Sequence, residues 1–278
     1  MATSSPVIDQ ETRRRLELAM QVAKTAGRQI LRSFQDERLA VEQKVDRSVV
    51  TEADRAAETL LRQTILHAFA DDTVVGEEHG TSPGSSGWTW YLDPIDGTQA
   101  FVRGVPLFGT LIGIEYNGES RAGVICLPAL GEMVYAARGH GCHWVRGMQP
   151  EGDSGFSAGE KQLAHVSKVA ALPDALFLTS WMQSFFETGT IPKFLRLSEA
   201  TGVTRGWGDC YGYTLVATGR AEIMVDPVLN VWDAGPMLVV LEEAGGCYTT
   251  FAGKPDIHGG TGVATNGLLH KAVLEILK

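Results

Sequence analysis

An Asn-Gly pair between two apolar runs is the feature of this sequence that most constrains its fold. Residues 107–116 and 121–126 read as extended apolar stretches, and Asn117-Gly118 lies between them. Asn-Gly is the strongest short signal for a β-hairpin, because a tight hairpin turn requires positive φ at both central residues. A further strand-like run follows at 133–137. We therefore expect consecutive antiparallel strands between residues 107 and 145.

Helical periodicity precedes these strands. Apolar residues recur with helical spacing between Leu16 and Phe34, and a second such pattern runs from about residue 51 to 69. Short extended runs follow at 73–75 and 88–92, separated by a Gly- and Ser-rich stretch. Helices followed by hairpin strands predict an α+β N-terminal half.

The second half of the chain alternates between strand-like and helix-like stretches, which is typical of an α/β layer. A segment rich in Gly, Ser and charge, residues 147–161, is the best candidate for a boundary, so we divide the chain into 1–146 and 147–278. The strand-like stretches of the second half are 175–179, 222–225 and 263–265, and the helix-like ones are 191–200, 208–218, 232–244 and 268–277.

Composition limits the classes of partner. The 278 residues include 24 Lys and Arg against 33 Asp and Glu, a formal net charge of -9, which repels nucleic acid. We find no run of the roughly 18 apolar residues that a membrane-spanning helix needs. Four scattered cysteines and the lack of a recognisable signal peptide favour reduced thiols in the cytoplasm. An anionic substrate would need something positive to offset the negative field locally, and a divalent cation held by the chain's own carboxylates would do so.

Carboxylates follow two of the predicted strands. The apolar run at 90–92 leads into D-P-I-D-G-T at 93–98, and a shorter run ends in G-E-E at 76–78. Taken alone, the first motif also fits a turn in which Asp93 and Asp96 bind backbone amides, and the second fits a solvated pair. If both strand ends meet, however, the acids repel each other unless a cation lies between them, and all-oxygen ligands suit Mg²⁺, Mn²⁺ or Ca²⁺.

Two further acids stand at predicted helix starts. Asp54 belongs to V-T-E-A-D at 50–54, and Asp233 belongs to W-D at 232–233. Helix capping explains either one by itself.

In this order, the four motifs V-T-E-A-D, G-E-E, L-D-P-I-D-G-T and W-D resemble the signature set of the inositol monophosphatase superfamily, over nearly the whole chain. The resemblance implies a layered αβαβα sandwich with an α+β N-terminal half, which carries most of the metal ligands, and an α/β C-terminal half. It also implies two or three Mg²⁺ ions, with Mn²⁺ as the alternative. These would activate water for hydrolysis of a small phosphate monoester without a covalent enzyme intermediate.

The resemblance assigns roles to individual residues. The implied metal ligands are the side chains of Glu77, Asp93, Asp96 and Asp233 and the carbonyl of Ile95. The amides of Gly97 and Thr98 would meet the substrate phosphate. Asp54 and Thr98, together with Glu77, would orient and deprotonate the attacking water. Lys44 and Asp46 lie in a loop that often adds a metal contact in the family. The resemblance assigns no role to Arg103, which has two interpretations: contact with the phosphate or an ion pair with a nearby acid.

The leaving group is expected to be read by the C-terminal half. The stretch W-G-D-C-Y-G-Y at 207–213, with D-G-T-Q-A-F-V-R-G-V-P at 96–106, is similar to the histidinol-phosphate phosphatase branch. An acid and aromatic residues suit a cationic, flat group. This likeness implies that Asp209, Asp226 and Glu222 read the cationic part of L-histidinol phosphate, while Trp207 and Tyr211 either help or pack in the core.

We therefore expect a Mg²⁺-dependent histidinol-phosphatase of histidine biosynthesis. An inositol-1-monophosphatase or a broad-specificity phosphatase is the alternative, and a non-catalytic phosphate or metal sensor is a third hypothesis. Further expectations are a homodimer, as is common in the family, no nucleic-acid or membrane partner, and no particular lithium sensitivity.

Overall fold

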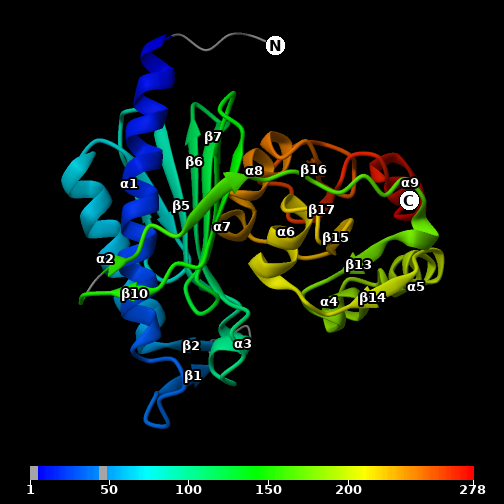
Figure 1. The fold of residues 1–278 in the computed structure, drawn as a ribbon, viewed down its shortest axis with the longest axis horizontal. Helices are drawn as coiled ribbons and strands as arrows, with labels where there is room; N and C mark the ends of the chain where they lie inside the picture. Colours follow the sequence, from blue (N-terminus) through cyan, green and yellow to red (C-terminus); the bar gives the residue numbers. More distant parts are fainter. Residues whose placement is uncertain (1–5, 44–48, 154) are drawn as a thin grey trace.

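Two β-sheets alternate with three layers of helices, as Figure 1 shows for the computed structural model, which describes residues 6–43, 49–153 and 155–278. Helices α1 (Pro6–Leu31) and α2 (Glu52–Ala68) cover the outer face of the larger sheet. Helices α7 (Val231–Ala234) and α8 (Met237–Glu243) lie between the two sheets. The αβαβα sandwich implied by the family resemblance is confirmed.

The larger sheet has eight strands in the order β12-β9-β8-β7-β6-β5-β3-β4. All neighbouring pairs are antiparallel except β3 and β5, which run parallel. The strands are β3 (Thr73–Gly76), β4 (Gly80–Ser82), β5 (Trp88–Asp96), β6 (Gly109–Tyr116), β7 (Glu119–Leu127), β8 (Glu132–Ala137), β9 (Cys142–Arg146) and β12 (Glu160–Leu163).

The predicted hairpin forms at Asn117-Gly118. These two residues have φ of 48° and 78°, and Tyr116 pairs with Glu119 across the turn. Side chains of β7 then alternate between two cores: Val124 packs on the side of α1, and Ile125 packs on the side of α8. The hairpin therefore builds the centre of a sheet that is covered on both faces.

The smaller sheet has five strands in the order β14-β13-β15-β17-β16. Helices α6 and α8 pack on its inner side, and a separate core beneath α4, α5 and α9 closes its outer side. Its strands are β13 (Leu176–Leu178), β14 (Val203–Arg205), β15 (Ile223–Asp226), β16 (Cys247–Thr249) and β17 (Gly262–Thr265). The helices are α4 (Met182–Glu187), α5 (Ile191–Ala200), α6 (Asp209–Ala217) and α9 (His270–Ile276), with a 3-10 turn at Leu172–Asp174.

Short elements complete the chain. They are the pair β1 (Val41–Gln43) and β2 (Val49–Thr51), the single turn α3 (Thr98–Phe101), and the hairpin β10 (Pro150–Glu151) with β11 (Gly155–Phe156). The glycine-rich segment that follows β9 carries this hairpin and then returns as β12, which pairs with β9. The larger sheet therefore continues past residue 146 to Leu163. None of the described helices is long and apolar enough to cross a membrane.

The single helix predicted over residues 232–244 is wrong, because the structure has α7 and α8 instead. Pro236 stands at the N-cap of α8 and has no N–H to donate, which interrupts the helical hydrogen bonds. The backbone of Gly235 at this break lies on Gly113 of β6: a Cβ on Gly113 would stand 2.4 Å from the Gly235 carbonyl carbon. Glycine on both sides therefore lets α7 approach the sheet at the site described next.

Candidate metal centre and catalytic site

The end of strand β5 presents two carboxylates on the same side of the chain. Asp93 pairs with Leu111 and Asp96 pairs with Gly109, so three steps along β5 match two along β6. Side chains 93 and 96 of a regular strand would point to opposite faces. The β-bulge between them inserts one residue and so turns both toward one point.

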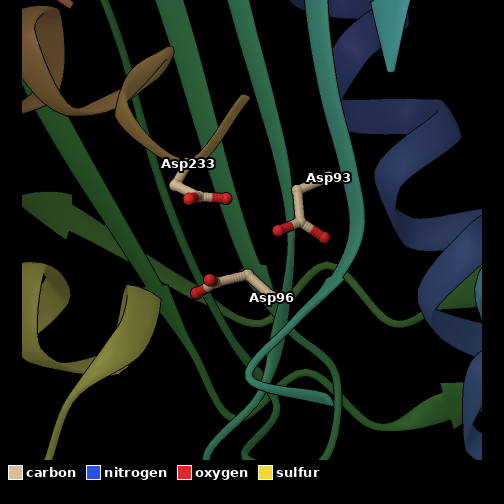
Figure 2. A group of neighbouring side chains, drawn as sticks. All are labelled: Asp93, Asp96 and Asp233. Carbon is tan, nitrogen blue, oxygen red and sulfur yellow. The ribbon is translucent and has the colours of Figure 1, made fainter. Parts of the chain in front are cut away.

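Helix α7 brings a third carboxylate to this point. Oxygen atoms of Asp93, Asp96 and Asp233 all lie within 4.8 Å of one another, and Figure 2 shows the three groups facing each other. Asp233 also accepts a hydrogen bond of 3.0 Å from the backbone N–H of Asn230, in a capping box. The capping explanation for Asp233 is thus correct, and it is compatible with membership of the acidic cluster.

Strand β3 delivers Glu77 to the same edge. Gly76 pairs with Leu92 on the parallel strand β5, and the N–H of Glu77 donates to the carbonyl of Leu92 at 3.2 Å. Glu77, which directly follows β3, therefore lies beside Asp93, where the regular pairing of β5 ends. Its negative charge is felt by both Asp93 and Asp233, whose pKa values it raises.

The cluster is electrostatically strained in a way that a cation would relieve. Burial, followed by the charge of Glu77, raises the pKa of Asp93 well above its ordinary value. Burial also raises the pKa of Asp96 well above its ordinary value and that of Asp233 to about 7. Oδ1 of Asp93 is buried and accepts no hydrogen bond. An unpartnered buried carboxylate oxygen costs free energy, so this all-oxygen donor set fits a hard divalent cation.

Asp54 and Thr98 lie beside this cluster. Asp54 closes a capping box on α2, where one of its oxygens accepts hydrogen bonds from the N–H of Thr51 at 2.8 Å and from its hydroxyl at 2.5 Å. Its other oxygen is 3.3 Å from the hydroxyl of Thr98, which is also 2.9 Å from the carbonyl of Ile95. Capping therefore fixes the Asp54 carboxylate while leaving one oxygen directed at Thr98.

Gly97 begins helix α3 in a conformation that requires glycine. Its φ is 84°, and a Cβ there would stand 2.9 Å from the carbonyl of Leu107 and 3.2 Å from Oδ2 of Asp209. The backbone therefore passes close to Asp209, a residue of the C-terminal half. The carbonyl of Ile95, which lies 2.9 Å from the Thr98 hydroxyl, has two lone pairs.

Asp209 stands in the first turn of α6, near Asp96 of the acidic cluster. It is a non-glycine residue with φ of 52°, and its N–H donates to the hydroxyl of Ser180 at 2.7 Å. The N–H of the next residue, Cys210, donates to Asp96. Burial, and then the charge of Asp226, raises the pKa of Asp209 to about 7.

Asp226 and Glu222 have their carboxylates engaged within the protein. Asp226 accepts from the N–H and hydroxyl of Ser180 at 2.9 and 3.1 Å, and from the Tyr213 hydroxyl at 2.9 Å. Glu222 is buried and accepts from the N–H of Leu176 at 2.7 Å. Asp226 is joined to Asp209 through Ser180, whereas Glu222 precedes the opposite end of β15 (Ile223–Asp226), away from Asp209.

The other predicted residues are placed as follows. Trp207 is 44% exposed and so is not a core residue, whereas Tyr211 is partly buried and packs against the central core. Arg103 donates to the backbone and side chain of Gln99, an alternative that the sequence did not suggest. Lys44 and Asp46 lie outside the described residues.

Two residues that shape the site were missed in the sequence. Ser180 bridges Asp226 and Asp209, but it carries no local signal because its partners are distant in the chain. Glu58, on α2, contacts the turn that holds Glu77. Its signal is present, since it lies one helical turn after Asp54 on the buried face.

Comparisons with known proteins agree with this geometry. A family model described as the inositol monophosphatase family matches residues 11–278. A histidinol-phosphatase from Chlorobaculum parvum is 38% identical over 250 residues, covering 90% of this chain and 91% of that protein. A fructose-1,6-bisphosphatase/inositol-1-monophosphatase from Aquifex aeolicus is 29% identical and covers 95% of each. The solved inositol monophosphatase from Zymomonas mobilis superposes with a TM-score of 0.80 at 27% identity, over 99% of both chains.

Proposed function

Because the chain belongs to the inositol monophosphatase family of metal-dependent phosphoric monoester hydrolases, we propose that it hydrolyses L-histidinol phosphate to L-histidinol and phosphate. The observation that carries the substrate is Asp209, a carboxylate held beside Gly97 at the start of α6. The 38% identity with a histidinol-phosphatase supports the same choice. The reaction belongs to histidine biosynthesis.

The part of the site around Asp93, Asp96 and Asp233, which we call the metal end, would hold two or three Mg²⁺, or Mn²⁺ in their place. When bound, the cations lower the pKa of water and screen the phosphate charge. Three acids of the cluster converge on one point, and the buried Oδ1 of Asp93 has no other partner. The remaining proposed ligands are Glu77 and the carbonyl of Ile95.

Asp54 and Thr98 would handle the proton of the attacking water. The Thr98 hydroxyl has a single proton to share between the Ile95 carbonyl at 2.9 Å and Asp54 at 3.3 Å, so its oxygen keeps lone pairs that can accept a hydrogen bond from water. Two bonds from Thr51 hold the carboxylate of Asp54 in this orientation. The amides of Gly97 and Thr98 at the start of α3 would hold the phosphate, next to this pair.

The part of the site around Asp209 and Asp226, which we call the leaving-group end, would recognise the ammonium and imidazole of histidinol. Asp209 supplies the negative charge, and the exposed ring of Trp207, two residues earlier, offers a face for a cation. Asp226 would act through Ser180, which binds the N–H of Asp209. Glu222 would contribute indirectly, because it accepts from the N–H of Leu176 and so holds the start of β13.

An inositol-monophosphatase-like enzyme of broad specificity is the second candidate, favoured by the likeness to the Aquifex and Zymomonas proteins. A non-catalytic sensor is disfavoured, because a sensor would need neither Asp54 nor Thr98. We also propose that the protein is a cytoplasmic homodimer that binds neither nucleic acid nor membranes. Light scattering on the purified protein tests the dimer.

The proposed substrate is tested by phosphate release from L-histidinol phosphate and myo-inositol 1-phosphate in parallel, each with Mg²⁺ and with EDTA. We expect kcat/KM to favour histidinol phosphate about 100-fold or more, roughly 2.7 kcal/mol, and to vanish with EDTA. Comparable rates on both esters would support the broad-specificity enzyme instead. No release from either would support the sensor.

A further inference from the structure

We propose that Glu58 is a positioning residue, which fixes the turn after β3 so that Glu77 can bind metal. The inference rests on the proposed metal-binding role of Glu77. Glu58 lies in the middle of α2, its side chain is fully buried, and it belongs to none of the four acidic motifs. A buried carboxylate needs a reason, because its burial is costly unless donors surround it.

The donors around Glu58 come from the turn that carries Glu77. The N–H of Glu78 donates to one carboxylate oxygen at 2.7 Å, and the N–H of His79 donates to the other at 3.2 Å. A Cβ on Gly76 would stand 2.1 Å from this carboxylate, so the space beside Gly76 is taken by Glu58 itself. Glu58 therefore contacts the chain directly before Glu77 and directly after it.

Arg62 also binds the Glu58 carboxylate. Its guanidinium donates to Glu58 at 2.7 Å and to the carbonyls of Val74 and Gly80 at 3.1 and 2.7 Å. It thereby holds β3 and β4 together and balances the buried charge of Glu58. A planar guanidinium suits this role because its donors are fixed relative to one another.

Helix α2 connects two parts of the site, the Asp54–Thr98 pair and the turn that carries Glu77. Asp54 and Glu58 are four residues apart on the same buried face, and Asp54 contacts Thr98 while Glu58 holds the Glu77 turn. Residues three or four apart on a helix face the same way. The helix therefore sets the position of Glu77 relative to the pair that would handle the water.

The test is Glu58→Gln, with Mg²⁺ binding to the purified full-length protein measured by calorimetry in the absence of substrate. The side-chain amide of glutamine places an NH₂ group where the carboxylate oxygens of Glu58 accept only N–H donors. Two donors then face each other, so the turn that carries Glu77 must shift. We expect the dissociation constant for Mg²⁺ to rise about 10- to 100-fold, the range typical for residues that orient metal ligands. The kcat of Glu58→Gln should lie closer to the wild-type value at saturating Mg²⁺ than at low Mg²⁺.

Asp72→Asn is the matched control. Asp72 is equally buried, accepts two bonds from Arg15 at 2.8 and 2.9 Å, and directly precedes β3 at the end away from the site. We expect this variant to lower Tm but to leave the Mg²⁺ dissociation constant within about twofold of wild type.

Wild-type Mg²⁺ affinity in Glu58→Gln, or an equal loss in Asp72→Asn, would overturn the inference while leaving the proposed function intact. A wild-type protein that binds no Mg²⁺ would overturn both. If Glu58→Gln does not fold, Arg62→Lys decides the question. Lysine keeps the positive charge but lacks the planar set of donors with which Arg62 binds several groups at once. This variant should therefore also weaken Mg²⁺ binding, and an unchanged affinity would overturn the inference.

Discussion

The two ends of the site use buried aspartates in opposite ways. At the metal end, Asp93 has an oxygen that is buried and accepts no hydrogen bond, and its neighbours are other acids. At the leaving-group end, Asp226 accepts bonds from Thr179, Ser180 and Tyr213. The same residue type is therefore satisfied by the protein at one end and left for a cation at the other.

The number of hydrogen bonds that a buried carboxylate accepts therefore distinguishes carboxylates that stabilise the fold from those that are available to bind a ligand. Removal of a satisfied carboxylate leaves its donors unpaired and costs stability. Removal of one member of an acidic cluster relieves repulsion and costs activity instead. Substitutions at the two ends should therefore have opposite effects on the metal-free protein.

The largest effect is expected for Asp93→Asn. Loss of a direct ligand should lower kcat/KM by more than the roughly 100-fold that loss of a ligand-orienting residue can cost. The same change removes a buried negative charge, so Tm measured in EDTA should rise. Phosphate release and thermal melts of the same preparation check both parts. A fall in Tm as large as that of a core substitution would show that Asp93 is structural.

Asp226→Asn should behave in the reverse manner. The amide cannot accept from all of the donors that surround Asp226, so we expect unfolding to become easier by about 2–3 kcal/mol. Denaturant melts in EDTA measure this loss. A variant as stable as wild type would contradict the view that Asp226 is satisfied within the fold.

Asp209→Asn tests the leaving-group end more finely. Loss of one charged contact, roughly 1.5–3 kcal/mol, should raise KM for histidinol phosphate about 10- to 150-fold. The KM for glycerol phosphate, which has no cationic group, should change little. Equal losses on both esters would refute the role of Asp209 in substrate choice.

The smallest effect is the pH dependence of metal-free stability. Burial holds the pKa of Asp233 and of Asp209 at about 7, above the value of 3.8 for a free carboxyl. Between these pH values, unfolding releases the protons that the two acids hold in the folded state, so their contribution to the free energy of unfolding is largest near pH 4 and falls as the pH rises toward 7. Thermal melts in EDTA across this range check the slope. Added Mg²⁺ should flatten it, because the cation favours the ionised acids.

Local signals in the sequence predict the parts of the fold that depend on neighbouring residues. The Asn117-Gly118 hairpin forms because the turn conformation is intrinsic to that pair. The capping roles suggested for Asp54 and Asp233 are also present. The family motifs supplied the layer order, and the structure brings Asp93 and Asp233 together as the motifs imply.

What the sequence could not predict depends on contacts between distant segments. The break between α7 and α8 depends on the approach of Gly235 to Gly113, and the bulge in β5 depends on its register with β6. Likewise, the partners that satisfy Asp226 come from the two residues that follow β13 and from α6. A motif shows which acids are present but not which donors they meet.

The most direct test of the metal site is a crystal structure of the protein with Mn²⁺, with anomalous scattering used to locate the ion. The account predicts a peak among Asp93, Asp96 and Asp233, with the buried Oδ1 of Asp93 at about 2.0–2.2 Å from it. A peak elsewhere, or none at saturating Mn²⁺, would contradict the assignment of these carboxylates as metal ligands.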